Sequence, residues 1–253
     1  MLSIDLNADL GEGFGHYVVA DEGHVLPLVT SASIACGFHA GDPLTMRRSV
    51  RLALDHGVTV GAHPGYPDLL GFGRRDLGAT PEEVTAYVLY QVGALAAVCH
   101  AERTVLRYVK PHGALYNRAA TDAVVAAAVA EGVRLADPTL VLLGLAGSAL
   151  VSEGQRAGLR TAAEAFADRA YLADGTLAPR SRPGAVLTDE AAVVEQALGI
   201  VREQRVATLD GGSRPVHADS LCVHGDNPRA PALLRALRRR LNGEGITIAS
   251  FAG

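Results

Sequence analysis

The chain has 253 residues, of which 49% are hydrophobic, 20% charged and 5% aromatic, and its formal net charge at pH 7 is −4. This composition supports a buried core and excludes a disordered chain, and its length is common for a one-domain α/β barrel. Nucleic-acid binding is not expected, because it would need a basic face.

Short apolar runs alternate with helical patterns along the chain. The strands expected in chain order are Ser3–Ala8, Ser31–Cys36, Thr59–Ala62, Val105–Val109, Leu140–Leu145, Thr161–Phe166, Leu221–Val223 and Thr247–Phe251. Their nearly continuous apolar character is typical of parallel strands that are covered on both faces.

The helices between these runs carry recognisable start signals. A helix is expected from Pro43 to His56, where Gly57 stops it, and Thr80-Pro81-Glu82-Glu83 predicts a capped start for another. Asn227-Pro228 repeats the pattern of cap and proline before a helix over Arg229–Leu241. The run Arg238–Arg240 in that last helix is expected to be a solvated face.

About eight strands alternating with helices predict a parallel α/β fold. We expect a closed (β/α) barrel, distorted or short of eight full units, which forms a single domain over residues 1–253. A doubly wound open sheet is the alternative, but it would normally bring a glycine-rich phosphate loop. Gly11-Glu12-Gly13-Phe14-Gly15 has the wrong spacing for one, and no GxxxxGK[ST] string occurs.

The sequence also favours a cytoplasmic location. Its start turns polar by Asp5 and does not resemble a signal peptide, and no run of ~18 apolar residues predicts a membrane span. Cys36, Cys99 and Cys222 are odd in number and far apart, so we expect reduced, mostly buried thiols.

Polar side chains gather where six of the predicted strands end. In chain order these groups are Asp5, Asn7, Asp9 and Glu12; His39 and Asp42; His63 and Asp68; Lys110, His112 and Asn117; Glu164, Asp168 and Arg169; and His224, Asp226 and Asn227. Taken singly, Asp42 and Asn227 could be helix caps and Asp5 could pair with a structural arginine. In a parallel barrel, however, these ends share the rim on which active sites are built, so we predict a site for a small, polar substrate.

The spacing leaves a metal undecided. Asp9, His39 and His63 could form an Asp/His/His set for a divalent cation. The chain has no HExxH string and no close His-x-His or Cys pair, so we assign no metal ligand. The alternative is acid–base and electrostatic catalysis by the same groups.

The ordered motifs together resemble the LamB/YcsF family, the A-subunits of bacterial 5-oxoprolinase. The strings that carry this resemblance are Asp5-Leu6-Asn7-Ala8-Asp9-Leu10-Gly11-Glu12-Gly13, those around His39 and His63, Lys110–Asn117, Glu164–Arg169 with Pro179-Arg180, and His224–Pro228. One departure is Ser33, where the family pattern has Asn. The resemblance implies a barrel similar to the glycoside hydrolase/deacetylase superfamily. It also implies ATP-dependent ring opening of 5-oxoproline to L-glutamate, together with partner subunits B and C.

Within that function we expect Asp9, or else Glu164, to activate water as the general base. His39, His63 or His112 would protonate the leaving nitrogen or stabilise the oxyanion. Lys110 and Arg169 would hold the substrate carboxylate or a transferred phosphate, although Lys110 could instead neutralise a carboxylate such as Glu164. The full set expected to bind substrate is Asn7, Glu12, Lys110, Asn117, Asp168, Arg169, Arg180, His224 and Asp226.

Two other functions stay open on the sequence alone. A metal-dependent deacetylase of N-acetyl sugars would hold a divalent ion tightly and would work without ATP. A non-catalytic subunit that presents substrate to its partners would lose binding and assembly, but no separate chemical step, when rim residues change.

Overall fold

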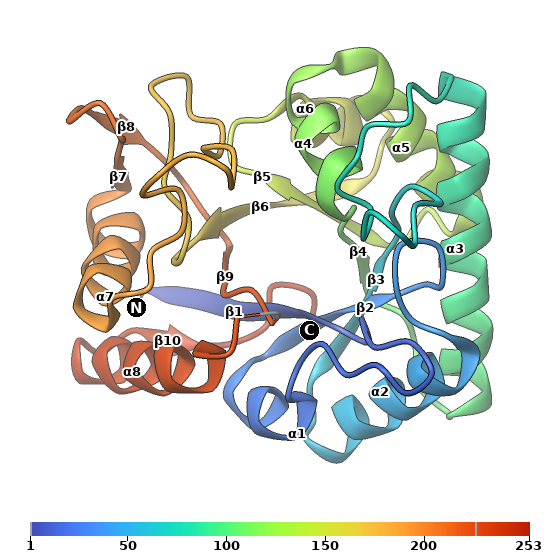
Figure 1. The fold of residues 1–253 in the computed structure, drawn as a ribbon, viewed down its shortest axis with the longest axis horizontal. Helices are drawn as coiled ribbons and strands as arrows, with labels where there is room; N and C mark the ends of the chain where they lie inside the picture. Colours follow the sequence, from blue (N-terminus) through green and yellow to red (C-terminus); the bar gives the residue numbers. More distant parts are fainter. Residues whose placement is uncertain (1, 226) are drawn as a thin grey trace.

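Seven parallel strands close into a barrel in the computed structural model, which describes residues 2–225 and 227–253 (Figure 1). The barrel closes because β1 pairs with β2 along one edge and with β9 along the other. In spatial order its strands are β1 (Ser3–Leu10), β2 (Ser31–Ala35), β3 (Thr59–His63), β4 (Tyr108–Val109), β5 (Val141–Leu145), β6 (Arg160–Phe166) and β9 (Ser220–Cys222). The expected barrel with fewer than eight units is therefore confirmed.

Helices surround the barrel and cover the outer faces of its strands (Figure 1). They are α1 (Glu22–Val25), η1 (Leu26–Leu28), α2 (Pro43–Asp55), α3 (Pro81–Ala101), α4 (Gly113–Thr121), α5 (Ala123–Ala136), α6 (Ala149–Arg156), α7 (Glu190–Leu198), η2 (Gly199–Glu203) and α8 (Ala230–Gly243). The side chain of Asp42 caps α2, and Thr80 forms a capping box with Glu83 at the start of α3, as the sequence predicted.

Some boundaries differ from the expectation. The helix α8 begins one residue late, and Asn227 does not cap it directly; its Oδ1 instead accepts a hydrogen bond from the Arg229 backbone N–H at 2.9 Å. An antiparallel hairpin of β7 (Arg205–Ala207) and β8 (Ser213–Pro215) was not predicted, because its short strands are largely exposed and lack an apolar run.

The last predicted strand does not belong to the barrel. The strand β10 (Thr247–Ile248) pairs only with Ser3 and Ile4 at the beginning of β1. The chain then turns under the barrel, where the ring of Phe251 lies 5.1 Å from that of Tyr108, between centroids. Residues 247–252 therefore close the end of the barrel that is opposite the rim.

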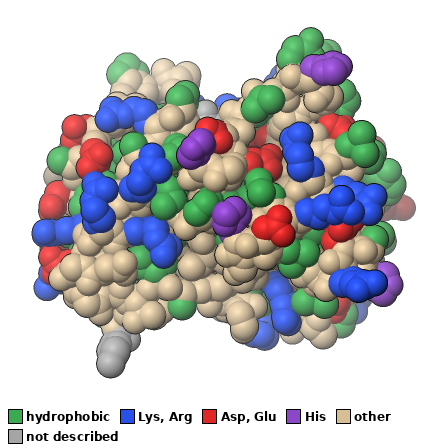
Figure 2. Space-filling model, turned by 90° about the horizontal axis from the view of Figure 1, so that it is seen from below, with side chains coloured by type: hydrophobic (Ala, Val, Ile, Leu, Met, Phe, Trp, Pro, Cys, Tyr) green, Lys and Arg blue, Asp and Glu red, His purple; other side chains and the backbone are tan. Residues whose placement is uncertain are grey.

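Two surface features bear on the expected partners. Among the described residues, α3 is the one helix long and apolar enough to cross a membrane, but it packs as an outer helix of the barrel against α5. Figure 2 shows basic side chains on the left, the side on which α8 lies in Figure 1. In α8, Arg239 and Arg240 are exposed and form ion pairs with Glu190 and Glu244, so the solvated helix face is confirmed.

The barrel interior is polar below the rim. Asp5 is fully buried and accepts hydrogen bonds from the hydroxyls of Thr30 (2.6 Å), Ser31 (2.7 Å) and Ser220, rather than from an arginine. Burial raises the pKa of Asp5 from 3.8 to about 6, against the opposing effect of these hydroxyls, and the charge of Glu164 adds to the increase. Asp5 therefore takes up a proton in the folded state at a pH at which the unfolded chain is already ionised.

Asp5→Asn is expected to flatten the pH dependence of stability. The raised pKa means that the wild type loses stability, relative to the variant, as pH rises from about 4 to above 6. One pKa unit corresponds to about 1.4 kcal/mol, so this relative loss approaches roughly 3 kcal/mol. Urea unfolding of both proteins across this pH range measures it.

Asp42→Asn is the matched control. Hydrogen bonds, first of all from Thr45, lower the pKa of Asp42 to about 2. Relative to Asp42→Asn, the wild type should therefore gain stability as pH rises, and this change should occur at lower pH than the change seen with Asp5→Asn. Parallel profiles for the wild type and Asp5→Asn above pH 4 would contradict the assignment to Asp5.

Candidate active site

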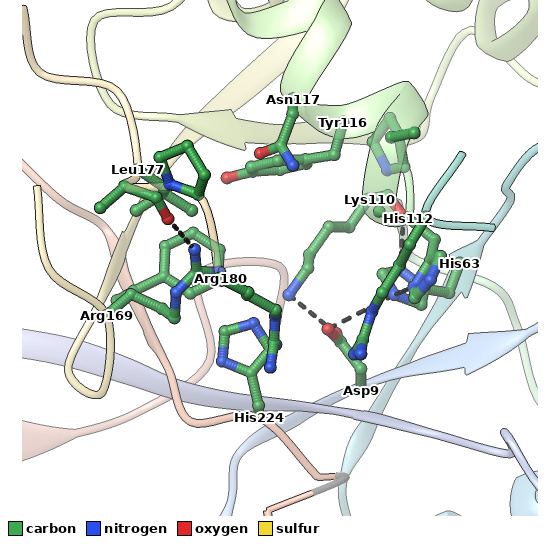
Figure 3. Close-up of a pocket in the computed structure, with 17 residues that line it drawn as sticks. Asp9, His63, Lys110, His112, Tyr116, Asn117, Arg169, Leu177, Arg180 and His224 are labelled. Carbon is green, nitrogen blue, oxygen red and sulfur yellow. Dashed lines mark hydrogen bonds and ion pairs between the residues drawn. The ribbon is translucent and has the colours of Figure 1, made fainter. Parts of the chain in front are cut away.

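A cavity of about 340 Å³ opens at the carboxyl ends of the barrel strands (Figure 3). Its wall combines one carboxylate, three imidazoles, one ammonium and three guanidinium groups. The lining residues are Asp9, His63, Arg74, Lys110, Pro111, His112, Gly113, Ala114, Tyr116, Asn117, Phe166, Arg169, Leu177, Ala178, Pro179, Arg180 and His224. The predicted rim is thus the wall of one concave site, as expected for a small ligand.

A buried ammonium group lies at the floor of this cavity. Lys110 is the only lysine in the chain, and its side chain is 2% exposed. Its Nζ lies 2.7 Å from Asp9 Oδ1, 2.8 Å from Glu164 Oε1 and 3.1 Å from Asn7 Oδ1. Since an ammonium group has three N–H donors, these acceptors leave none for a substrate anion. Lys110 therefore neutralises carboxylates in this structure, as the alternative expected, and its anion-binding role stays a prediction.

Glu164 lies beneath the cavity rather than in its wall. It is fully buried, and its oxygens accept hydrogen bonds from Asn7 Nδ2 at 2.9 Å and the Tyr116 hydroxyl at 2.7 Å, besides Lys110. With these partners in place, Glu164 has no free path to a substrate. These contacts place Glu164 against Lys110 and Tyr116, and its role as a second candidate base stays a prediction.

Asp9 is the carboxylate that reaches the cavity. Its Oδ2 lies 3.4 Å from His63 Nε2, on the side opposite Lys110 (Figure 3). Burial by itself raises the pKa of Asp9, but His63 and Lys110 outweigh that effect and hold the pKa well below 3.8. For Lys110, burial lowers the pKa, but its carboxylate partners, Asp9 first, raise it well above 10.5. Both groups are therefore charged at neutral pH.

Next to Asp9, three imidazoles and one carboxylate form a compact group. Glu12, His39, His63 and His112 are all buried, and one ligand atom of each lies within 4.8 Å of the others. The rings of His39 and His112 are stacked, with centroids 3.8 Å apart. Burial, together with the neighbouring imidazoles, holds the pKa values of His39 and His112 well below 6.5. This group differs from the set Asp9, His39 and His63 that the sequence left open, because Glu12 and His112 belong to it and Asp9 lies beside it.

Two glycines make room for these rings. A Cβ atom added at Gly65 would lie 2.8 Å from His39 Nδ1, and one added at Gly73 would lie 2.7 Å from the Cβ of His39 and 2.8 Å from Cδ2 of His112. Gly73 also has a φ of +63°, which favours glycine. The loop after β3 can therefore approach the histidines only because these side chains are missing.

Across the cavity from the imidazole cluster lie Arg169, Arg180 and His224 (Figure 3). Arg169 donates to the carbonyl of Ala178 at 2.5 Å, and burial, with Arg180 nearby, lowers its pKa to about 10. His224 Nδ1 lies 2.9 Å from Asp168 Oδ1, so Asp168 orients His224 from behind. This wall presents positive charge opposite Asp9.

Of the predicted site residues, some line the cavity, others lie behind its wall, and one is not described. Those that line the cavity are Asp9, His63, Lys110, His112, Asn117, Arg169, Arg180 and His224. Those that lie behind the wall are Asn7, Glu12, His39, Glu164 and Asp168. Asp226, expected to bind substrate, lies outside the described residues.

The sequence reasoning missed several lining residues, among them Arg74, Tyr116 and Phe166. Arg74 follows the glycine-flanked segment Gly71–Gly73 in the loop after β3, and these glycines are a signal that could have pointed to it. Tyr116 belongs to the string Lys110–Asn117, and Phe166 is the last residue of β6. Neither carries a charge, so their contribution to the wall depends on the fold rather than on a motif.

Comparison with known proteins identifies the relatives of this chain. The LamB/YcsF family profile matches residues 4–253. The chain belongs to the LamB/YcsF family. Among the LamB/YcsF relatives, the A-subunit of 5-oxoprolinase from Geobacillus kaustophilus is 55% identical over 248 residues, which cover 98% of this chain and 96% of that protein. The protein of the same name from Chloroflexus aggregans is also 55% identical over 248 residues, with 98% of both chains covered.

A solved structure supports the same LamB/YcsF assignment. The lactam utilization protein from Thermus thermophilus is 49% identical and superposes with a TM-score of 0.93, covering 99% of this chain and all of that one. Fold and family thus agree over nearly the whole length, and the motifs that suggested LamB/YcsF membership are the segments that build the cavity.

Proposed function

We propose that this chain opens the lactam ring of 5-oxoproline to give L-glutamate, in an ATP-dependent reaction that it shares with partner subunits B and C. The observation that carries the proposal is one cavity in which the carboxylate of Asp9 lies beside an imidazole cluster and faces arginines. The names of the relatives, A-subunit of 5-oxoprolinase and lactam utilization protein, support this substrate class.

The substrate chemistry suits these groups. 5-Oxoproline combines an anionic carboxylate with a cyclic amide whose resonance makes attack by water slow. Phosphorylation of the carbonyl oxygen by ATP activates the carbonyl carbon. In this proposal Arg180, Arg169 and Arg74 hold the carboxylate or the phosphoryl group, since guanidinium groups bind such anions bidentately.

Asp9 then accepts a proton from the attacking water. A carboxylate with a low pKa is a modest base, and the prior activation of the carbonyl makes a stronger base unnecessary. The imidazole cluster stabilises the negative charge that develops on the oxygen. The ring C–N bond then breaks, and the leaving nitrogen takes up the proton that Asp9 accepted. The acyl phosphate that results is hydrolysed by a second water molecule to L-glutamate and inorganic phosphate. Asn117 and His224 complete the wall and orient the ring.

ATP is assigned to the partners, because the chain contains no glycine-rich phosphate loop of the usual spacing. A cytoplasmic location belongs to the same proposal. It is supported by Cys36, Cys99 and Cys222, which are free and buried, as expected in a reducing compartment.

Glutamate release should require all three subunits and ATP. The experiment mixes the purified chain with 5-oxoproline and ATP, with and without subunits B and C, and measures glutamate and ADP. We expect coupled release only from the complete mixture. If the chain alone hydrolysed ATP in step with 5-oxoproline consumption, the assignment of ATP to the partner subunits would be wrong. If it deacetylated N-acetyl sugars without ATP, the proposed substrate class would be wrong.

A further inference from the structure

Two ring nitrogens in the imidazole cluster, His63 Nε2 and His112 Nδ1, face each other 2.9 Å apart. The other nitrogens of these rings are held by backbone carbonyls: His63 Nδ1 lies 2.7 Å from the carbonyl oxygen of Lys110, and His112 Nε2 lies 2.8 Å from the carbonyl oxygen of Phe72. A carbonyl oxygen only accepts, so His63 Nδ1 and His112 Nε2 each carry a proton. When both rings are neutral, His63 Nε2 and His112 Nδ1 therefore both present lone pairs.

Such an arrangement is repulsive unless a positive charge lies between or beside the two lone pairs. Carboxylates approach from both sides, with Glu12 Oε1 3.4 Å from His112 Nδ1 and Asp9 Oδ2 3.4 Å from His63 Nε2. The donor atoms therefore converge on one point at which a cation would be stabilised.

A third imidazole is available at the same point. His39 is fully buried, and neither of its ring nitrogens has a hydrogen-bond partner. Its Nε2 lies 3.6 Å from Glu12 Oε1. Leaving such a side chain unsatisfied is costly, so a ligand for it is expected.

We propose that Glu12, His39, His63 and His112 bind one divalent transition-metal cation of the zinc type. Three imidazole nitrogens with one carboxylate oxygen are ligands that such an ion prefers. Ligands 2.0–2.1 Å from a tetrahedral ion lie about 3.3 Å from one another, and the separations of 2.9, 3.4 and 3.6 Å are close to that value.

The hydrogen bonds of His63 and His112 to backbone carbonyls are also those that fix the tautomer of a metal-ligating histidine. The ion would lie beside Asp9, where it can polarise a carbonyl oxygen. This inference concerns the site proposed above, but metal binding does not depend on which amide is opened.

Metal content is measured on the full chain, without substrate, ATP or partners. Protein purified from a zinc-supplemented culture is expected to retain about one ion per chain by elemental analysis. After chelation, Co²⁺ should bind at the same ratio and give the intense visible absorption of a tetrahedral site. Zn²⁺ added back should raise the melting temperature, because only the folded state holds the ligands together.

Glu12→Gln and His112→Gln should each weaken Co²⁺ binding by at least about 100-fold, beyond the 10–100-fold that loss of an outer-shell partner causes. His100→Gln, at an exposed position at the end of α3, is the matched control and should bind as the wild type does. Wild-type protein that retains no metal and gives no saturable Co²⁺ signal would overturn the proposal, and so would equal binding by Glu12→Gln. Because none of these measurements uses glutamate release, a wrong substrate would leave them unchanged.

Discussion

Asp9→Asn should reduce the rate of ring opening by about 10²–10⁴-fold, which is the range that general-base catalysis contributes. Asparagine retains the size and a carbonyl acceptor at this position but cannot take the proton of the attacking water. Lys110 remains paired with Glu164 at 2.8 Å in the variant, so the floor of the cavity should persist. Steady-state glutamate release by the complete three-subunit mixture measures the rate.

The control for Asp9→Asn is Asp219→Asn. Asp219 is exposed at the opposite end of the barrel, where its Oδ2 accepts a hydrogen bond from the Ala163 N–H at 2.8 Å. This variant should lose little activity. A near wild-type rate in folded Asp9→Asn would remove Asp9 from the mechanism, whereas equal losses in both variants would point to stability instead of chemistry.

Lys110→Met should destabilise the fold by about 3–5 kcal/mol, the cost expected when one partner of a buried ion pair is removed. Methionine fills much of the space, but it leaves Glu164 fully buried without its cation and removes the cation that lies 2.7 Å from Asp9. This effect differs from that of an anion-binding lysine, whose loss would chiefly raise KM for 5-oxoproline at unchanged stability. Chemical denaturation gives the free energy of unfolding.

A second substitution tests the cause of that loss. In Lys110→Met/Glu164→Gln the uncompensated charge of Glu164 is gone, although that of Asp9 remains. The glutamine that replaces Glu164 can still pair with Asn7 and Tyr116, so part of the stability should return. Because the chain has one lysine, ¹⁵N-lysine labelling gives a single Nζ signal that reports the pair directly in the wild type. If the double variant lost as much stability as the sum of the losses in Lys110→Met and Glu164→Gln alone, Lys110 and Glu164 would not be energetically coupled.

The sequence predicted the barrel and its rim because strand ends, caps and glycines are local signals. Lys110 and His112 do reach the same cavity, as expected from their spacing of two around Pro111. The sequence could not tell which carboxylate would face the substrate. Asp9 and Glu164 both lie in apolar runs, but Glu164 is held deeper, among Asn7, Lys110 and Tyr116, whereas Asp9 lies at the surface of the cavity.

The imidazole cluster shows the same limit. Glu12, His39, His63 and His112 lie on four different loops or strand ends, so no spacing in the chain links them. The approach of the loop after β3 through Gly65 and Gly73 decides which of the rim histidines meet. The sequence therefore could not show that Glu12 and His112, and not Asp9, would lie in one group with His39 and His63.

The position of β1 imposes an order on biosynthesis. Residues 3–10 are synthesised before the other barrel strands, yet two of the strands that pair with them, β9 and β10, are synthesised after all the others. Asp5 accepts a hydrogen bond from Ser220, which is 215 residues further along the chain. The barrel therefore cannot close until β9 has been made, and β1 keeps an unpaired edge until then. The polar interior around Asp5 is completed only at that point.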